Sequence, residues 1–360
     1  MTVYYTVFVI TLILAKLLPD RNRKEYLWKV IITLLPLFLF GALRVDFGLD
    51  YATYEAEYMA LHSGVHIGVN KHSEIGFQYL LQILPTWRCV VGCTALVLCI
   101  AWGVLLYRNV GRNYLYIAIF LMFCIGNYTV YTPLVAMRNG LTISIMMLSF
   151  PLIEQRKYLL VLAIAFLGHY IHSSIMLFMP IALLVGRNNE LTTREIKIWL
   201  VVILILMLLS ASTLVTIVAP YVLDKFERYE YVFDIMSQSQ HDSWLVNIAN
   251  IALLSVVLVQ FYKHRAELTK SENSYFRIGM IYLLCGFLGT LGSARTQAYF
   301  LPFFILILVK LYSMKWKDQV AKLIFFLFVV AYFLYRFFYI WQWNNPYFVF
   351  EDYESVIGNF

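Results

Sequence analysis

VVGCTALVLCIAWGVLLY, residues 90–107, contains no charged side chain and is followed by Arg108. An α-helix rises about 1.5 Å per residue, so such a run can cross or nearly cross the roughly 30 Å hydrocarbon core of a bilayer. Similar apolar runs recur along the whole chain, and 61% of the 360 residues are hydrophobic while 14% are charged. This composition excludes a soluble globular protein and predicts a polytopic membrane protein.

The apolar runs predict an all-α bundle of about twelve transmembrane helices in one membrane domain, residues 1–360. The predicted spans are residues 3–18, 27–43, 90–107, 114–127, 136–153, 158–171, 173–186, 198–218, 244–262, 275–292, 296–313 and 322–340. Several runs are short, so about ten to thirteen spans fit the sequence. The first run has no basic residue before it and no small-residue cleavage site after it, which predicts a retained helix rather than a signal peptide.

Lys and Arg predict the orientation, because basic loops resist translocation. If the N-terminus is outside, twenty of the 28 basic residues fall in inner segments. The long connections, about 44–89 and 219–243, and the tail 341–360 then lie outside, so chemistry is expected at the outer face. The net charge of +7 is mostly this topology signal, and no nucleic-acid partner is expected. Eight outer basic residues are exceptions and candidate ligands of an anion: Arg44, Lys71, Arg88, Arg138, Lys225, Arg228, Arg295 and Arg336.

A polar cluster, RVDFGLDYATY at residues 44–54, follows the second predicted span. Removing charged groups from water at a membrane boundary is costly unless they are paired or used, so this cluster marks a candidate site. Asp46 and Asp50 are four residues apart and can share a helical face, and Arg44 nearby would keep at least one of them ionised. Glu74, in EIGFQ at 74–78, continues the cluster ahead of a short apolar stretch, 79–84, which predicts a re-entrant or interfacial helix.

Two arginines stand at the outer ends of later spans. Arg138 opens the fifth predicted span, where its planar fork of donors and the amides of a helix start both suit phosphate oxygens. The alternative for Arg138 is a side chain that snorkels to lipid headgroups. Arg295 occupies the outer turn between the tenth and eleventh spans, where pairing with Asp46 or Asp50 and binding a phosphate are equally open.

Two histidines lie between the sixth and seventh predicted spans, in HYIHSS at 169–174. His169 and His172 are three residues apart and could point together into the bundle. A neutral imidazole there could accept a proton from a hydroxyl, so His172 is a candidate general base, with a structural hydrogen bond as the alternative. No further metal-ligand type lies nearby, the five cysteines show no paired spacing, and no phosphate-binding glycine loop, HExxH or GxSxG is present, so no metal and no cofactor are expected.

These elements together resemble the EpsG family of bacterial exopolysaccharide proteins, which is grouped with Wzy-type polysaccharide polymerases. The resemblance runs from about residue 43 to residue 304: RxDxGxDYxxY after the second span, Glu-x-Gly-Phe before the third, an early Arg in a middle helix, Ile-His-Ser-Ser, and a late Arg before an aromatic-rich helix. The block at 44–54 is its most specific part.

The resemblance implies a metal-independent glycosyltransferase with a GT-C-like membrane fold in the bacterial inner membrane, active at the periplasmic or external face. Its substrates would be undecaprenyl-pyrophosphate-linked oligosaccharides, with membrane lipids around it and a chain-length regulator and a flippase as candidate partners. The implied pyrophosphate ligands are Arg138, Arg295 and Arg44, and the candidates for activating the sugar hydroxyl are His172, Asp46 and Asp50. Further residues expected to contact substrate are Tyr51, Tyr54, Glu74, Asn139 and His169.

Three other activities use related features. An O-antigen-ligase-like enzyme would take the same donor and a different acceptor. A lipid-linked-oligosaccharide transporter should carry charges through the midplane of several helices, whereas most charges here lie at helix ends. An outer-facing acyltransferase could also use a histidine, but no acidic partner stands beside His172 in sequence.

Overall fold

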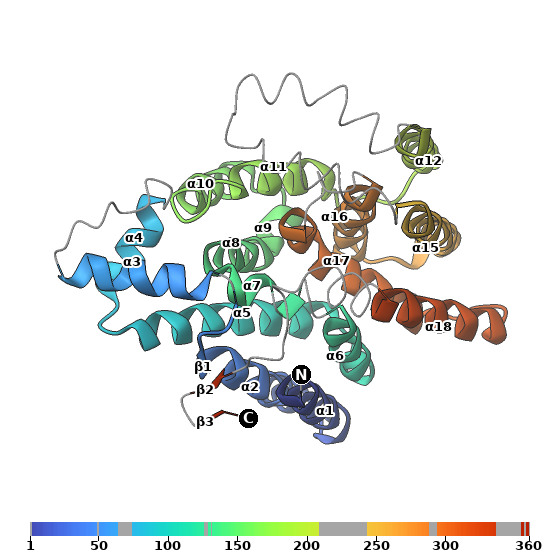
Figure 1. Ribbon diagram of the computed structural model, residues 1–360. Helices are drawn as coiled ribbons and strands as arrows, with labels where there is room; N and C mark the ends of the chain where they lie inside the picture. Colours follow the sequence, from blue (N-terminus) through green and yellow to red (C-terminus); the bar gives the residue numbers. More distant parts are fainter. Residues whose placement is uncertain are drawn as a thin grey trace.

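The computed structural model describes residues 2–48, 50–63, 74–125, 129–130, 132–208, 243–287, 294–335, 354–355 and 358–359. Most of these residues are helical (Figure 1). The α-helices are α1 (Thr2–Leu17), α2 (Arg23–Ala42), α3 (Tyr51–Ser63), α4 (Ile75–Ile83), α5 (Trp87–Asn109), α6 (Leu115–Cys124), α7 (Thr132–Val135), α8 (Met137–Leu148), α9 (Phe150–Glu154), α10 (Tyr158–His169), α11 (Ile175–Val185), α12 (Thr193–Leu208), α15 (Ser243–Lys263), α16 (Lys270–Phe287), α17 (Ala294–Ser313) and α18 (Gln319–Tyr335). Short 3-10 turns lie at Arg112–Tyr114 and Arg265–Glu267.

A helix forms at every predicted apolar run, which confirms the all-α class. Within the described residues, three helices are long and apolar enough to cross a membrane: α2, α5 and the Thr296–Ser313 part of α17. Others are shorter, such as α10 and α11 with 12 and 11 residues. The number of spans therefore stays a prediction. Residues 126–127, 209–218, 288–292 and 336–340 of the predicted spans, the loop at 219–242 and most of the tail 341–360 lie outside the described residues.

Helix α5 contains the apolar run at 90–107 and runs through the middle of the bundle (Figure 1). The Thr86 hydroxyl caps its start by accepting a hydrogen bond from the amide of Cys89 at 3.2 Å. On one side α5 packs against α2 and on the other against α8, while α16 packs along α17. The predicted span at 136–153 is divided into α8 and α9, which meet at Ser149.

A small antiparallel sheet joins distant parts of the chain. Strand β1 (Arg44–Val45) pairs with β2 (Glu354–Ser355), which pairs with β3 (Gly358–Asn359), in a register that sets Arg44 opposite Ser355. Near the other terminus, the ring of Tyr4 lies 6.3 Å from the ring of Phe40, close to the end of α2. The first turn of α1 and strand β2 therefore both lie near the end of α2 (Figure 1).

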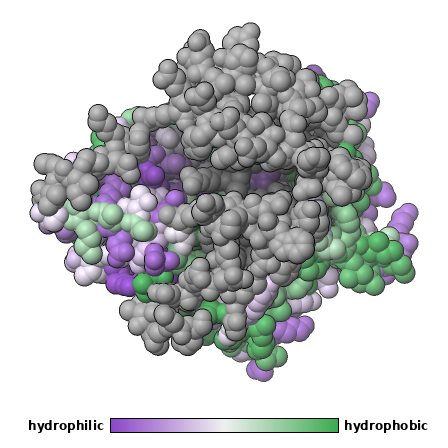
Figure 2. Space-filling model, viewed as in Figure 1, coloured by the Kyte–Doolittle hydropathy of each residue, from purple (hydrophilic) through white to green (hydrophobic). Residues whose placement is uncertain are grey.

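Apolar side chains remain exposed on several helices, as expected for surfaces that face lipid. On the face drawn in Figure 2, hydrophobic residues cover α18, where Leu323 and Ile324 are about three-fifths exposed, and hydrophilic residues gather over α3. Helix α4 buries Phe77 and Leu81 while it exposes an apolar stripe on its other side. This is the pattern of the predicted interfacial helix, whose depth in the membrane stays a prediction.

Candidate functional site

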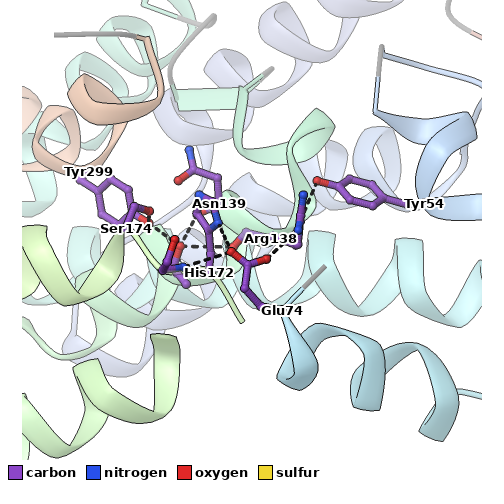
Figure 3. Close-up of polar contacts among 9 residues, drawn as sticks. Tyr54, Glu74, Arg138, Asn139, His172, Ser174 and Tyr299 are labelled. Carbon is purple, nitrogen blue, oxygen red and sulfur yellow. Dashed lines mark hydrogen bonds and ion pairs between the residues drawn. The ribbon is translucent and has the colours of Figure 1, made fainter. Parts of the chain in front are cut away.

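The carboxylate of Glu74 is the centre of a polar cluster formed by three separate segments (Figure 3). Oε2 accepts a hydrogen bond from Nη1 of Arg138 at 2.6 Å. Oε1 lies 3.0 Å from Nδ1 of His172 and accepts a longer hydrogen bond, 3.3 Å, from the amide of Ser173. Glu74, which precedes α4, therefore contacts both the first turn of α8 and the turn between α10 and α11.

A glycine allows Glu74 to reach that turn. Glu74 is the extended residue that precedes α4, and the amide of Gly76 donates to the carbonyl oxygen of Tyr170 at 2.7 Å. A Cβ added at position 76 would lie 2.7 Å from the same oxygen, closer than packed atoms approach. The backbone of α4 thus docks directly on the turn that carries His172.

A break between two helices positions Arg138. Helix α7 ends at Val135 and α8 begins at Met137, with Ala136 in a non-helical conformation. Gly140 permits the tight approach of the two helices, because a Cβ there would overlap the carbonyl oxygen of Pro133. This places Arg138 in the first turn of α8, where the helix dipole also favours an anion.

Arg138 has a second partner in α3. Its Nε donates to the hydroxyl of Tyr54 at 3.4 Å, and its guanidinium lies 5.5 Å from the centre of the Tyr54 ring. Tyr54 is buried, with its ring edge-on to Phe77 of α4. The guanidinium is therefore held between a carboxylate and an aromatic face, in a geometry that suits arginine better than lysine.

Three hydroxyls extend the cluster into the bundle. The Tyr299 hydroxyl lies 2.8 Å from Oγ of Ser174 and 2.5 Å from Oγ1 of Thr142, which stands one helical turn after Arg138. Beside them Asn139 is 2% exposed, and neither its amide nitrogen nor its amide oxygen has a hydrogen-bond partner among the described residues. A buried amide without a partner is costly, so this position is suited to a polar ligand.

Electrostatics keep Glu74 ionised. Burial alone would raise the pKa of Glu74, but the hydrogen bond from His172 and the positive charge of Arg138 outweigh it and lower the pKa to about 2. A carboxylate accepts hydrogen bonds, so Nδ1 of His172 carries the proton in this network. In the neutral imidazole the acceptor nitrogen is then Nε2, which bonds to no residue in the described part of the chain.

Other predicted site residues lie around this cluster or apart from it. Arg44 is completely buried and donates to the carbonyl oxygens of Gly41 at 3.0 Å and Leu134 at 2.7 Å, so these contacts hold backbone together. Its carbonyl oxygen accepts a hydrogen bond from Arg88, which also contacts the buried Tyr51 hydroxyl at 3.4 Å. Roles of Arg44 and Tyr51 in substrate binding stay predictions.

The two aspartates and the first histidine are not among the contacts of Glu74. Asp46 is exposed with a positive φ of 44°, and Asp50 is half-buried just before α3, where its carbonyl oxygen accepts from the amide of Tyr54. His169 is exposed at the end of α10. Arg295 lies in the first turn of α17, four residues before Tyr299, so the two positions share a face of that helix; its side chain lies outside the described part of the structure.

The sequence indicated Glu74, Arg138 and His172 as site residues, but not that Glu74 contacts the other two. It did not indicate the cluster of three hydroxyls from Thr142, Ser174 and Tyr299. A tyrosine one turn after a candidate arginine in an apolar helix was the available signal for Tyr299. Among the described residues no three His, Cys, Asp or Glu side chains gather at metal-binding distance.

Long apolar helices and a charged cluster at one end of the bundle define this chain as a helical membrane protein with a polar site. The chain belongs to the EpsG family, whose sequence model matches residues 26–355. No curated protein and no solved structure matches the chain.

Proposed function

We propose that this protein is a polysaccharide polymerase of the bacterial inner membrane, active at the outer face. It transfers a growing glycan from its undecaprenyl-pyrophosphate carrier to a hydroxyl of a new lipid-linked repeat unit. Membership in the EpsG family supports a polysaccharide polymerase, and the cluster around Glu74 supplies groups for such a transfer.

In the proposed step, an oxygen of the acceptor sugar attacks the anomeric carbon of the donor glycan. The bond from that carbon to the pyrophosphate oxygen breaks, and undecaprenyl pyrophosphate leaves with the bonding electrons. The hydroxyl proton passes to Nε2 of His172, while Glu74 holds Nδ1–H and stabilises the imidazolium that forms. Asp46 and Asp50 are second candidates for orienting the hydroxyl, since one of them stands a turn before Tyr54.

The leaving pyrophosphate needs cations. Arg138 lies in the first turn of α8 beside Glu74, and its planar guanidinium suits phosphate oxygens. We assign the pyrophosphate contacts to Arg138 and Arg295, because the leaving pyrophosphate gains negative charge in the transition state and guanidinium groups stabilise that charge. The side-chain amide of Asn139 would bind a sugar hydroxyl, since it is buried and has no hydrogen-bond partner among the described residues.

The single observation that carries this proposal is the bond from Glu74 to Nδ1 of His172, which orients Nε2 as a proton acceptor. This acidic partner, unseen in the sequence next to His172, is supplied by the loop before α4. The same pair would serve an O-antigen-ligase-like enzyme, so the acceptor separates the two activities.

The test is polymerisation in a purified system. The protein is reconstituted in lipid nanodiscs with a synthetic polyprenyl-pyrophosphate repeat unit, and products are resolved on a gel and by mass spectrometry. We expect a ladder spaced by one repeat unit, lost in His172→Ala. Transfer only to an unrelated acceptor would identify a ligase, and movement of intact donor across vesicle membranes without new glycosidic bonds would identify a transporter; either result would overturn the proposal.

A further inference from the structure

A second polar region lies at the end of α11 opposite to His172. A partly open cavity of ≈ 440 Å³ is formed there by the end of α11, the following loop and the first turns of α12. Its lining residues are Leu184, Val185, Arg187, Asn189, Thr192, Arg194, Glu195, Ile198 and Trp199. The positive-inside bias predicts that this end of the bundle faces the cytoplasm.

Buried Arg277 binds Glu195, which lines the cavity. Only 1% of Arg277 is exposed, and its Nε and Nη2 bind the two carboxylate oxygens of Glu195 at 2.5 and 2.8 Å. Its Nη1 also binds the carbonyl oxygens of Arg187 at 2.6 Å and Asn189 at 2.9 Å. Arg277 thus neutralises the charge of Glu195. It also binds the two loop carbonyl oxygens, which would otherwise repel an anion in the cavity.

The remaining charge in the cavity is positive. Arg187 and Arg194 are exposed, and neither side chain makes an ion pair or a hydrogen bond within the described residues. Thr192 caps α12 by accepting from the amide of Glu195 at 3.1 Å, so the positive end of that helix dipole points the same way. Two guanidiniums and a helix start form a site for a phosphate group.

Apolar side chains complete the lining. Leu184 is 64% exposed and Ile198 is 53% exposed, and Trp199 lies beside them in α12. A small soluble anion would contact only the cationic part of the cavity. A phospholipid would place its phosphate in the cationic part and its acyl chains against the apolar part. Basic pockets between membrane helices on the cytoplasmic side are known sites for anionic lipid headgroups.

We propose that this cavity binds an anionic glycerophospholipid, with its phosphate between Arg187 and Arg194 and its acyl chains along Leu184 and Ile198. This site is separate from the cluster around Glu74 and does not depend on the proposed polymerase activity.

The test is lipid binding to the full-length protein in detergent, followed by native mass spectrometry. The protein is titrated with phosphatidylglycerol and, in parallel, with zwitterionic phosphatidylcholine of the same acyl chains. We expect saturable binding of one phosphatidylglycerol with clear preference over phosphatidylcholine. Equal binding of the two lipids by the wild-type protein would overturn the proposal without any variant.

Two double variants locate the site. Arg187→Ala with Arg194→Ala should weaken phosphatidylglycerol binding about thirtyfold, from the usual contribution of two basic residues near a lipid surface. Lys315→Ala with Lys317→Ala removes the same charge from another exposed loop and should change nothing. Equal losses in both pairs would mean that binding follows net charge alone.

Two further measurements keep the outcome decisive. Arg187→Lys with Arg194→Lys retains the charge and should retain the preference for the anionic lipid, which guards against misfolding of the alanine pair. Glycerol phosphate at the lipid's concentration should not displace the bound lipid. Full displacement by glycerol phosphate would assign the cavity to a soluble anion and contradict the lipid proposal.

Discussion

Oε1 of Glu74 lies 3.0 Å from Nδ1 of His172, although the two residues are 98 positions apart in the chain. The other oxygen of the same carboxylate binds Arg138 at 2.6 Å. One acid therefore orients a proton acceptor and a cation together, and a change at any of the three groups should affect the other two.

Arg138→Lys should lower the polymerisation rate about ten- to hundredfold, the usual effect of losing a hydrogen bond to a charged group. A lysine can keep the charge next to Glu74, but it cannot contact both Glu74 and Tyr54 with a planar fork. Initial rates of repeat-unit transfer in nanodiscs measure the effect, with the thermal unfolding midpoint as the control for folding. Wild-type rates in a folded lysine variant would show that Arg138 is only an anchor.

Gly76→Ala should lower activity about ten- to hundredfold, because even a small displacement of a reacting group slows a reaction to that extent. The added Cβ meets the carbonyl oxygen of Tyr170 and pushes α4, with Glu74, away from His172. Gly92→Ala is the matched control, since a Cβ at position 92 in α5 meets no atom within 4 Å. If both alanine variants transfer repeat units at the wild-type rate, the docking of α4 does not position the site.

The pH dependence of stability reports on Glu74. Its pKa falls from 4.5 to about 2 on folding, so the ionised carboxylate stabilises the fold fully above about pH 4.5, and this stabilisation is lost as pH falls toward 2. The difference in unfolding midpoint between wild type and Glu74→Gln should therefore shrink across that window. Glu267→Gln, at an exposed acid, serves as the comparison. A constant difference from pH 6 to pH 2 would contradict the lowered pKa.

Most of the helices could be predicted, because long apolar runs such as 90–107 have few alternatives to a helix in a membrane. The sheet could not: β1 and β2 are two residues each, and their pairing joins positions 44 and 355, which no local pattern connects. The break at Ser149 was also missed, since the apolar character continues across it.

Within the site, single residues were predictable and their pairing was not. Arg138 and His172 stand out as polar groups at the ends of apolar helices, but only the docking of Gly76 on Tyr170 brings Glu74 between them. For Arg44 the contact partner could not be predicted. A charged side chain at a membrane boundary must have a partner, but the sequence does not show whether that partner is a ligand or, as the structure has it, backbone carbonyl oxygens.

The predicted orientation, with both termini outside, is open to a direct test. Single cysteines introduced at 188 and 192 should react with a membrane-impermeant maleimide only after the cells are opened, and one at 46 should react in intact cells. The five native cysteines are free thiols, so the comparison starts from a variant in which they are replaced. Labelling of the 187–197 loop in intact cells would reverse the topology.

The measurement that tests the central claim most directly is a double-mutant cycle on Glu74 and His172, read as the rate of repeat-unit transfer by purified protein in nanodiscs. His172→Ala should lower the rate about 10²- to 10⁴-fold, the usual contribution of a general base, while binding of the lipid-linked donor persists. Glu74 acts through His172 and also holds Arg138, so adding Glu74→Gln to His172→Ala should lower the rate by less than Glu74→Gln does alone. Full-rate transfer by His172→Ala, or losses that simply multiply in the double variant, would contradict the account.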